Sequence, residues 1–404
     1  MGWRLCHPIL CYKRICVFGE HEYYKERRHK SMIIKNGLIF VESGQFENGD
    51  LYIEGDKIAE SGAGETIDAS ELYVIPGLTD IHFHGCVGYD FCDGTKEALE
   101  KMAEYQLQSG ITTICPASMT FSEEQLTDIF ANAASYTSDS GATLVGINME
   151  GPFISMEKKG AQNGAYIHKP DAEMFFRLQD AANGLVKLVD IAPEGEGAME
   201  CIEQIQDKVR VSLAHTNADF DVADEAFKKG AKHVTHLYNA MPPYSHRAPG
   251  VIGAACDNEH VMVELICDGV HSHPATVRTT FKMFGDDRII LISDSMMACG
   301  LEDGQYTLGG QDVTVKGNLA TLTELGNIAG SVTNLMKCMC KAVKEMQIPL
   351  ESAVKCATAN PAKAIGIYDK YGSLTPGKYA DVVLLNKDLE IMYIIKSGKI
   401  VYSK

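Results

Sequence analysis

Hydrophobic and polar positions follow different patterns in the middle of the chain and at its two ends. Between residues 73 and 371, continuous apolar runs recur and are separated by stretches with helical spacing. Continuous runs are typical of strands that are buried on both faces, as in parallel sheets. Eight runs are predicted strands: residues 74–83, 112–117, 144–150, 186–191, 209–215, 233–237, 261–267 and 288–293.

Amphipathic segments separate most of these strands, among them residues 96–108, 123–134, 172–182 and 222–229. Repeated strand–helix units predict an α/β fold, a TIM-type (β/α)8 barrel over residues 73–371. A doubly wound sheet is the alternative that the same alternation allows. After the eighth strand, the pattern predicts a hairpin around Gly309-Gly310 and helices over residues 333–346 and 350–358.

The two ends of the chain share a different pattern of hydrophobic and polar residues. Residues 32–72 and 372–404 contain short runs with period-two alternation, separated by turn sequences such as Asn36-Gly37 and Ser397-Gly398. This pattern is typical of a β-meander. We therefore expect a small β-sandwich domain that is formed from both ends, with the barrel inserted between them.

The first 31 residues differ from the rest of the chain. They contain Trp3, the only tryptophan, and three of the thirteen cysteines. Lys13 and Arg14 interrupt the apolar stretch of residues 9–18, which is unlike the apolar region of a signal peptide. We expect Met32 to be the natural start and residues 1–31 to be a non-native or disordered extension.

Net charge, cysteine distribution and the length of apolar runs limit which kinds of binding partner and cellular location we expect. There are 37 Lys and Arg against 54 Asp and Glu, a formal net charge of −17, which argues against nucleic-acid binding. An anionic substrate would need a local basic group. The cysteines are scattered without a CxxC motif, and no apolar run reaches membrane-spanning length. We therefore expect reduced thiols, a cytoplasmic location and no membrane association.

Polar residues that can carry chemistry follow the ends of the predicted strands. Asp80, His82 and His84 close the first strand, and Glu150 closes the third. Later strands are followed by His215, His236, the pair Asp268 and His271, and Asp294. Barrel enzymes carry their active sites at the carboxyl ends of the strands. The sequence therefore predicts that these side chains converge on one mouth.

The residue types in this set favour a catalytic metal site. His82 and His84 are two residues apart on a strand, so both imidazoles point to the same side. Such a pair alone is equally compatible with two histidines that satisfy only local hydrogen bonds. Imidazoles together with Glu150 suit zinc, iron or a similar divalent ion, and the absence of cysteine fits a catalytic rather than a structural site.

Two further residues are interpreted differently. His233 lies three residues before His236, so we expect it to point away and to serve no site. Asp294 follows an apolar strand, where a carboxylate beside a metal can take a proton from water and pass it to a leaving amine. The plain structural alternative for Asp294 is a cap on the following loop.

Longer motifs carry a family resemblance. The general ones are Pro-Gly-x-x-Asp-x-His-x-His at residues 76–84, the late Asp294 and the closing segment 372–383. More specific are residues 150–153, 159–161, 236–242, 247–250 and 268–271. With these motifs the chain resembles the amidohydrolase superfamily from Met32 to Lys404, and within it the branch that deacetylates N-acetylglucosamine-6-phosphate.

This resemblance implies hydrolysis to glucosamine-6-phosphate and acetate, a step of amino-sugar catabolism. It matches Glu150, His215 and His236 to the principal metal ligands. His82 and His84 match a second metal position that only some members keep, so one or two ions per subunit are expected, zinc or iron, with Glu150 as the bridge.

The resemblance also implies the remaining roles. Asp294 matches the catalytic acid and base, and Arg247 matches an arginine that reaches the sugar phosphate across a homodimer interface. Some members have a histidine where Gln162 stands; glutamine can donate a hydrogen bond but carries no charge. The positions that match substrate-binding residues are Gln162, Asn239, Ala240, Arg247 and His271.

Other functions stay open at this point. The nearest is another metal-dependent amidohydrolase, such as an N-acyl-amino-acid deacetylase or a cyclic-amide hydrolase. No lysine ends the third or fourth predicted strand as a carbamylated ligand would, which weighs against the dihydroorotase and hydantoinase branches. A non-enzymatic alternative is a barrel scaffold without catalysis, but such chains usually lack some ligands, and here every ligand position is filled.

Overall fold

The computed structural model describes residues 31–137 and 140–404. The predicted extension, apart from Ser31, lies outside the described residues. Within them, no helix has the length and apolar character needed to span a bilayer.

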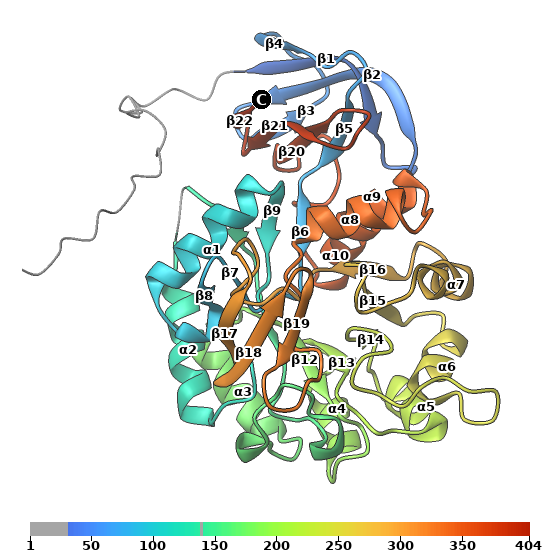
Figure 1. Ribbon diagram of the computed structural model, residues 1–404. Helices are drawn as coiled ribbons and strands as arrows, with labels where there is room; N and C mark the ends of the chain where they lie inside the picture. The colour runs from blue at the N-terminus through green and yellow to red at the C-terminus, as the bar shows by residue number, and fades with distance from the viewer. Residues whose placement is uncertain (1–30, 138–139) are drawn as a thin grey trace, which may run out of the picture.

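Strands from both ends of the chain form one sheet (Figure 1). Its order is β22-β21-β20-β5-β1-β2-β3, and β4 pairs with β1. Within this sheet, the antiparallel pair β5 and β20 joins strands from the two ends. The strands are β1 (Met32–Phe40), β2 (Phe46–Glu54), β3 (Lys57–Ala59), β4 (Glu65–Asp68), β5 (Tyr73–Pro76), β20 (Val382–Leu385), β21 (Ile391–Lys396) and β22 (Lys399–Ser403).

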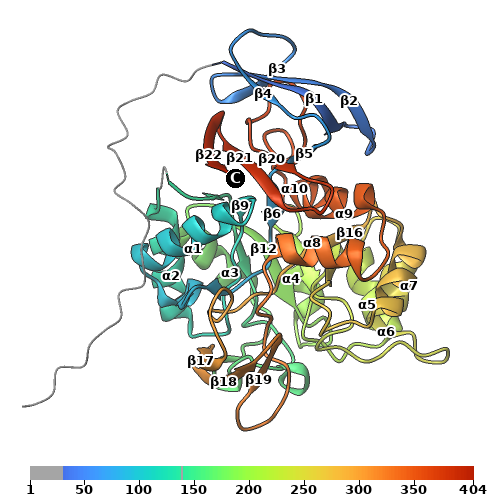
Figure 2. The same ribbon diagram turned by 45° about the horizontal axis from the view of Figure 1, so that its top comes forward.

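This end sheet has a hydrophobic cluster of its own. Ile34 and Val74 from the N-terminal part pack with Val382 and Ile395 from the C-terminal part. Gly37 is required where β1 meets β5, because a Cβ there would lie 2.6 Å from Cγ2 of Val74. Figure 2 shows the end sheet beside the last helices of the chain, α8 (Leu335–Lys344), α9 (Leu350–Ala357) and α10 (Ala359–Ala364).

The middle of the chain forms parallel strands. A three-stranded sheet, β10-β9-β6, precedes a six-stranded sheet that runs from β11 to β16 in sequence order. That order lacks the reversal that defines a doubly wound sheet, and the curled sheet is consistent with a TIM-like barrel. The strands are β6 (Leu78–Asp80), β9 (Ile111–Ile114), β10 (Thr143–Leu144), β11 (Ile147–Met149), β12 (Val186–Ile191), β13 (Arg210–Leu213), β14 (His233–Val234), β15 (Met262–Ile266) and β16 (Ile289–Ile292).

The prediction of one strand over residues 74–83 is wrong. Gly77 divides it: β5 pairs in the end sheet, whereas β6 pairs with β9 in the parallel sheet. Any side chain at Gly77 would collide with Thr112, since a Cβ there would lie 2.2 Å from its Oγ1. A periodicity argument sees one apolar run, because both halves are buried, although in different sheets.

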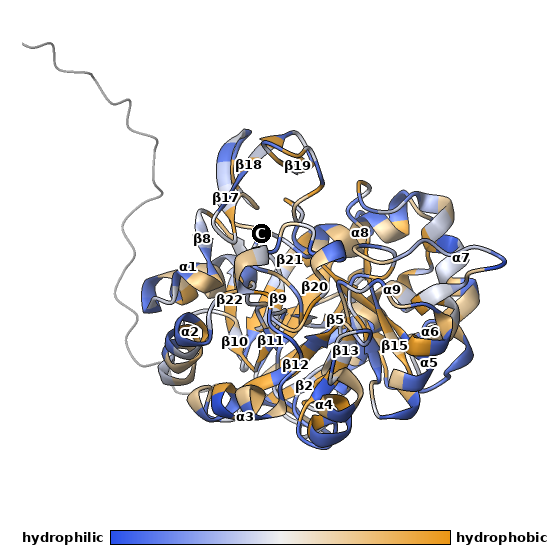
Figure 3. Cartoon of the chain, turned by 90° about the horizontal axis from the view of Figure 1, so that it is seen from below, coloured by the Kyte–Doolittle hydropathy of each residue, from blue (hydrophilic) through white to orange (hydrophobic). Residues whose placement is uncertain are grey.

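The helices lie outside the parallel strands and present polar faces outward (Figures 1 and 3). Several begin at side-chain caps: Ser122 forms a capping box with Gln125, and Asp171 accepts from two backbone N–H groups. The helices are α1 (Lys96–Gln108), α2 (Glu123–Ser135), α3 (Ala172–Ala181), α4 (Ala198–Ile205), α5 (Phe220–Lys228), α6 (Gly250–Asp257), α7 (Pro274–Phe284), α8 (Leu335–Lys344), α9 (Leu350–Ala357) and α10 (Ala359–Ala364).

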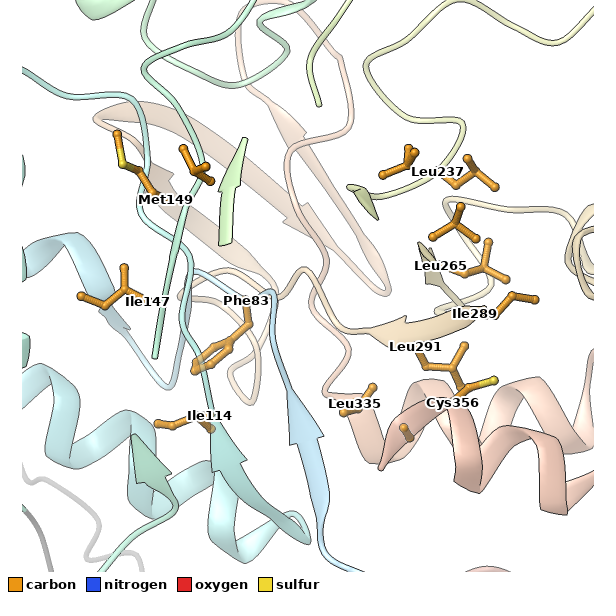
Figure 4. Packing of buried hydrophobic residues seen from close by; sticks show 14 of the residues in the cluster. Phe83, Ile114, Ile147, Met149, Leu237, Leu265, Ile289, Leu291, Leu335 and Cys356 are labelled. Atoms are coloured by element: carbon orange, nitrogen blue, oxygen red, sulfur yellow. The ribbon is translucent and has the colours of Figure 1, made fainter. Parts of the chain in front are cut away.

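The main hydrophobic core lies between the parallel strands and these helices. Figure 4 shows Phe83, Ile114 and Ile147 on one side, and Leu291 near Leu335 and Cys356 from α8 and α9 on the other. All six are buried.

An antiparallel sheet of three strands follows β16, and its first turn is the predicted one at Gly309-Gly310. Both glycines have positive φ, 55° and 78°, as a tight two-residue hairpin requires. Its buried face packs with Met119 and Met296. The strands are β17 (Gly304–Leu308), β18 (Gln311–Lys316) and β19 (Leu319–Leu322); a short hairpin, β7 (Gly85–Cys86) and β8 (Tyr89–Asp90), lies after β6.

Candidate metal centre and active site

Three of the predicted site residues occupy the same backbone position. His215, His236 and Asp294 each lie two residues after the end of a strand, β13, β14 and β16. Their φ angles are 44°, 30° and 47°, a left-handed conformation that is uncommon for residues other than glycine. Strained backbone of this kind clusters at functional sites.

Glu150 lies at the centre of the site. Its Oε1 is 3.1 Å from Nε2 of His215, 3.2 Å from Nε2 of His236 and 3.4 Å from Nε2 of His82. Its other oxygen, Oε2, is 3.3 Å from Nε2 of His84. One carboxylate therefore joins four imidazoles from three separate segments of the sequence.

These side chains form two ligand groups: Glu150, His215 and His236, and His82, His84 and Asp294. Oδ1 of Asp294 lies 3.3 Å from Nε2 of His84 and 3.8 Å from Nε2 of His82. All six residues are buried, and Asp294, at 8% exposure, is the most accessible of them. The structure thus brings together every predicted metal ligand and the predicted acid and base.

The donor set fits a divalent cation. Nε2 of His215 and Nε2 of His236 lie 3.1 Å apart, and the buried Nε2 of His82 has no hydrogen-bond partner among the described residues. The other ring nitrogens of His215 and His82 face acceptors, the Lys158 carbonyl and the Glu264 carboxylate. Ligating histidines are typically held in this way, with the second nitrogen on an outer acceptor.

The electrostatics keep the two carboxylates ionised. Burial acts to raise the pKa of Glu150, but the His82 and His84 imidazoles and hydrogen bonds from His215 and His236 hold that pKa well below its ordinary value. Burial likewise opposes ionisation of Asp294, but the hydrogen bond to His84 and nearby imidazoles lower its pKa. Ionised carboxylates are what a metal ligand and a proton acceptor require.

A cavity of about 480 Å³ opens onto the ligand groups. The predicted substrate residues Gln162, Asn239, Ala240 and His271 line it. Leu308, Asn327, Ile328 and Gly330, from the β17–β19 sheet and the loop after it, line it as well. Sequence reasoning did not predict these four, because nothing local in their segment indicates that it folds over the strand ends.

Gln162 is held on both sides. Its Nε2 donates to Oε2 of Glu150 at 2.6 Å, and its Oε1 accepts from the backbone N–H of Thr120 at 2.7 Å. The amide group therefore orients Glu150 in addition to lining the cavity.

His271 is paired with an acid. Its Nδ1 lies 2.8 Å from Oδ2 of Asp268, whose other oxygen accepts backbone N–H groups of Val270 and His271. Burial acts to lower the pKa of His271, but the hydrogen bond to Asp268 and its charge raise it above the ordinary value. The contact with Asp268 thus favours the positively charged form of the imidazole at the cavity.

Arg247 lies apart from this cluster. It is exposed on the turn between Ser245 and Ala248 and does not line the cavity. The described chain therefore leaves Arg247 at the surface, unlike the other predicted site residues.

Two more residues extend the site. His233, which we expected to serve no site, stays out of the ligand groups, but its Nε2 is 3.0 Å from Oε1 of the fully buried Glu264. The other oxygen of Glu264 contacts His82. The available signal for Glu264 is one charged residue within the apolar run 261–267.

Comparison with known proteins defines the class. Residues 73–401 match the model of the amidohydrolase family, and the chain belongs to that family. It is 36% identical to the N-acetylglucosamine-6-phosphate deacetylase of Bacillus subtilis (strain 168), over 92% of this chain and 98% of the relative. It is 31% identical to the N-acetylgalactosamine-6-phosphate deacetylase of Escherichia coli O157:H7, over 91% of this chain and 98% of the relative.

The fold of the chain is also similar to the solved structure of a deacetylase with the same name as the first of these relatives. A variant of N-acetyl-D-glucosamine-6-phosphate deacetylase from Mycobacterium smegmatis, in complex with N-acetyl-D-glucosamine-6-phosphate, aligns with a TM-score of 0.86 at 31% identity. The alignment covers 92% of this chain and 100% of the other.

Proposed function

We propose that this protein is a metal-dependent deacetylase that hydrolyses N-acetylglucosamine-6-phosphate to glucosamine-6-phosphate and acetate. The observation that carries the proposal is the buried cluster of Glu150, four histidines and Asp294 at the base of the cavity. The cluster occurs in a chain that matches known deacetylases of this substrate along nearly their whole length. A scaffold without chemistry would have no reason to retain six mutually placed ligands.

The fold that we propose for this activity is a complete (β/α)8 barrel over residues 73–371. Strands β6, β9, β10 with β11, and β12 to β16 would be its eight strands. In support of this closure, the backbone N–H of Asp294, just after β16, donates to the carbonyl of His82, just after β6. Residues 32–72 and 372–404 would form the small end domain beside it, proposed as a β-sandwich, and β5 joins that domain through its pairing with β20.

Glu150, His215 and His236 would hold one divalent ion, zinc or iron. His82 and His84, with Glu150 as the bridge, would hold a second. When bound, the metal would polarise the acetyl carbonyl and make a water molecule more acidic. Each ligand already has its Nε2 or carboxylate oxygen directed at the others.

Asp294 moves the proton. Its Oδ1 takes the proton that the attacking water loses as the oxygen–carbon bond forms. It then delivers that proton to the amide nitrogen as the carbon–nitrogen bond breaks, so that the amine leaves neutral with acetic acid, which afterwards loses its own proton to solvent and becomes acetate. The lowered pKa of Asp294 suits the first of these steps, because the carboxylate is ionised before reaction.

The remaining residues orient the substrate. Gln162, Asn239, the backbone of Ala240 and His271 line the cavity and would contact the substrate, with His271 as the residue that can offer positive charge to its anionic part. In a homodimer, Arg247 of one subunit would reach the phosphate in the other subunit's site, where its planar fork of donors suits phosphate oxygens. Local cations of this kind offset the net charge of −17. The setting for such a catabolic enzyme would be the cytoplasm.

The galactosamine epimer is a second candidate substrate, because one relative carries that activity in its name at 31% identity. The two substrates share the acyl group and the phosphate and differ at one hydroxyl. A side-by-side comparison of kcat/KM for both sugar phosphates decides between them.

The test of the proposed function is acetate release from N-acetylglucosamine-6-phosphate by purified protein. Chelation should abolish release, and addition of zinc or ferrous iron should restore it. Without a bound metal ion, the ligand groups contain no electrophile that could polarise the acetyl carbonyl. N-acetyl amino acids serve as control substrates. Release from these but not from the sugar phosphate would overturn the substrate assignment and keep the reaction class.

A further inference from the structure

A chain of hydrogen bonds runs through the interior of the parallel strands to the metal-ligand groups. Nε of Arg210 donates to Nδ1 of His233 at 3.1 Å, and Nε2 of His233 lies 3.0 Å from Oε1 of Glu264. Oε2 of Glu264 lies 2.9 Å from Nδ1 of His82. His233, Glu264 and His82 are each fully buried, so water does not compete for these contacts.

The donor at the start of the chain fixes the tautomer of His233. A guanidinium group can only donate hydrogen bonds, so Nδ1 of His233 must accept the one from Arg210. In a neutral imidazole the proton then resides on Nε2, which donates it to Glu264. Arg210 is itself anchored by the backbone carbonyls of Lys232 and Ala364.

The orientation of Glu264 in turn determines which ring nitrogen of His82 carries the proton. As an acceptor on both oxygens, the carboxylate receives Nε2–H of His233 on Oε1, and the backbone N–H of His236 on Oε2 at 3.1 Å. Nδ1–H of His82 is its third donor. With the proton of His82 on Nδ1, the lone pair on Nε2 faces Glu150 at 3.4 Å and Asp294 at 3.8 Å.

We propose that Glu264 is a positioning residue that holds His82 as an Nε2 metal ligand, with its own orientation set by His233 and Arg210. This inference rests on the proposed metal-dependent function, and it assigns to His233 and Glu264 a role in sustaining the second metal position. Because the same Oε2 also receives the backbone N–H of His236, Glu264 links a ligand of the second group to one of the first.

An amide in place of the carboxylate cannot satisfy this network. Glu264→Gln keeps the shape but offers one acceptor and one donor, whereas His233, His82 and the His236 backbone all present N–H groups. One donor therefore faces another in either orientation of the amide. Adding Arg210→Met releases His233 to accept at Nε2, which leaves the amide oxygen for His82 and the His236 backbone.

A zinc titration of each variant, followed by metal analysis, tests this reasoning. Glu264→Gln should weaken zinc binding at the second position about 10- to 100-fold, the usual effect of removing such a partner. The Arg210→Met, Glu264→Gln double variant should recover much of that loss. The matched control is Asp190→Asn, because Asp190 is an equally buried carboxylate that accepts from the Thr235 hydroxyl instead of a ring. It should bind zinc as the unaltered protein does.

Zinc binding by Glu264→Gln as tight as that of the unaltered protein would overturn the proposal, as would a double variant that is no better than the single one. Should Glu264→Gln fail to fold, the unaltered zinc-loaded protein decides the matter by nitrogen-15 NMR of its histidines. The expected result is a proton on Nδ1 of His82 and on Nε2 of His233; a proton on Nδ1 of His233 overturns the proposal. None of these readouts uses substrate, so they separate failure of this inference from failure of the proposed reaction.

Discussion

The environment of each buried carboxylate decides its charge. Glu264 is fully buried, which acts to raise its pKa, yet electrostatic attraction to the His82 and His233 imidazoles and hydrogen bonds from them lower it to about 2. Asp80 is equally buried but has mainly hydroxyl and backbone donors, and burial raises its pKa to about 7. Facing imidazoles, more than burial, therefore distinguish the carboxylates of the site, whose pKa values are lowered, from a nearby buried carboxyl group whose pKa is raised.

Asp294→Asn tests the proton-transfer role. An amide of the same shape cannot accept the proton of water, so kcat should fall by about 10²- to 10⁴-fold. Zinc held by Glu150, His215 and His236 should stay bound. The measurements are acetate release and metal content per subunit; turnover close to that of the unaltered protein would remove Asp294 from the role.

Asp268→Asn tests the charge on His271. The pKa of His271 is raised in the folded protein, so its imidazolium is present below that pKa and is lost as the pH rises through it. KM for the anionic substrate should therefore rise with pH on the alkaline side. In the variant, this rise should begin at lower pH, and KM near neutrality should increase about tenfold or more, the equivalent of about 1.5–3 kcal/mol for a hydrogen bond to a charged group.

The control for that prediction is the unphosphorylated sugar, whose KM should respond less to the same substitution. Identical pH profiles of KM for both proteins would show that His271 does not supply charge to the substrate.

At the scale of elements, the strand ends and the turns after them determine where functional groups lie. His215, His236 and Asp294 are all presented from left-handed residues just beyond a strand, whereas helices contribute stability from the outside. The β17–β19 sheet adds the opposite wall of the cavity through Leu308, and the loop after it adds Ile328. Among the described residues, the cavity is therefore lined from strands and loops, without residues of α1 to α10.

Asp171→Ala tests this separation. Asp171 caps α3 by accepting from the backbone N–H groups of Glu173 and Met174, at 2.9 and 3.1 Å. Its loss should lower the free energy of unfolding by about 1 kcal/mol, as for other N-caps, seen as a lower urea midpoint. Turnover should not change, because α3 contributes no residue to the cavity lining. Glu173→Ala, in the first turn of the same helix, is the control and should cost less; equal costs would contradict the capping argument.

At the scale of the whole molecule, the two ends of the chain meet in one sheet, and the cavity is bounded by segments far apart in sequence. Arg247 is the exception among the predicted site residues, since it is exposed and away from the cavity of its own chain. The substrate-binding role that we propose for Arg247 therefore depends on the proposed second subunit.

Arg247→Ala tests that requirement. KM for the sugar phosphate should rise, with little effect on the unphosphorylated sugar. Mixing Arg247→Ala subunits with Asp294→Asn subunits, under conditions that allow exchange, should restore activity, because a hybrid dimer combines an intact Asp294 with a partner's arginine in one site. The measurements are subunit exchange and acetate release; exchange without recovery would place Arg247 outside the neighbouring site.

The sequence was sufficient for much of the site and for the family. The His-x-His spacing, the residue types after each strand and the longer motifs are local properties, and membership of the amidohydrolase family confirms the resemblance that they carry. The structure brings Glu150, His215, His236, His82, His84 and Asp294 together as the strand-end argument predicted.

Local pattern could not supply what depends on contacts between distant segments. The break at Gly77 arises because one apolar run serves two sheets, which periodicity cannot distinguish. The contact between His82 and Glu264 joins residues 182 positions apart, and it exists only because the segment after β6 and strand β15 direct side chains into one interior. The sequence by itself thus determined which groups could bind metal and move a proton. Only the tertiary structure decided which buried donors orient those groups and which loops enclose the cavity. Burial and hydrogen bonding at those positions depend on which distant segments of the chain pack together.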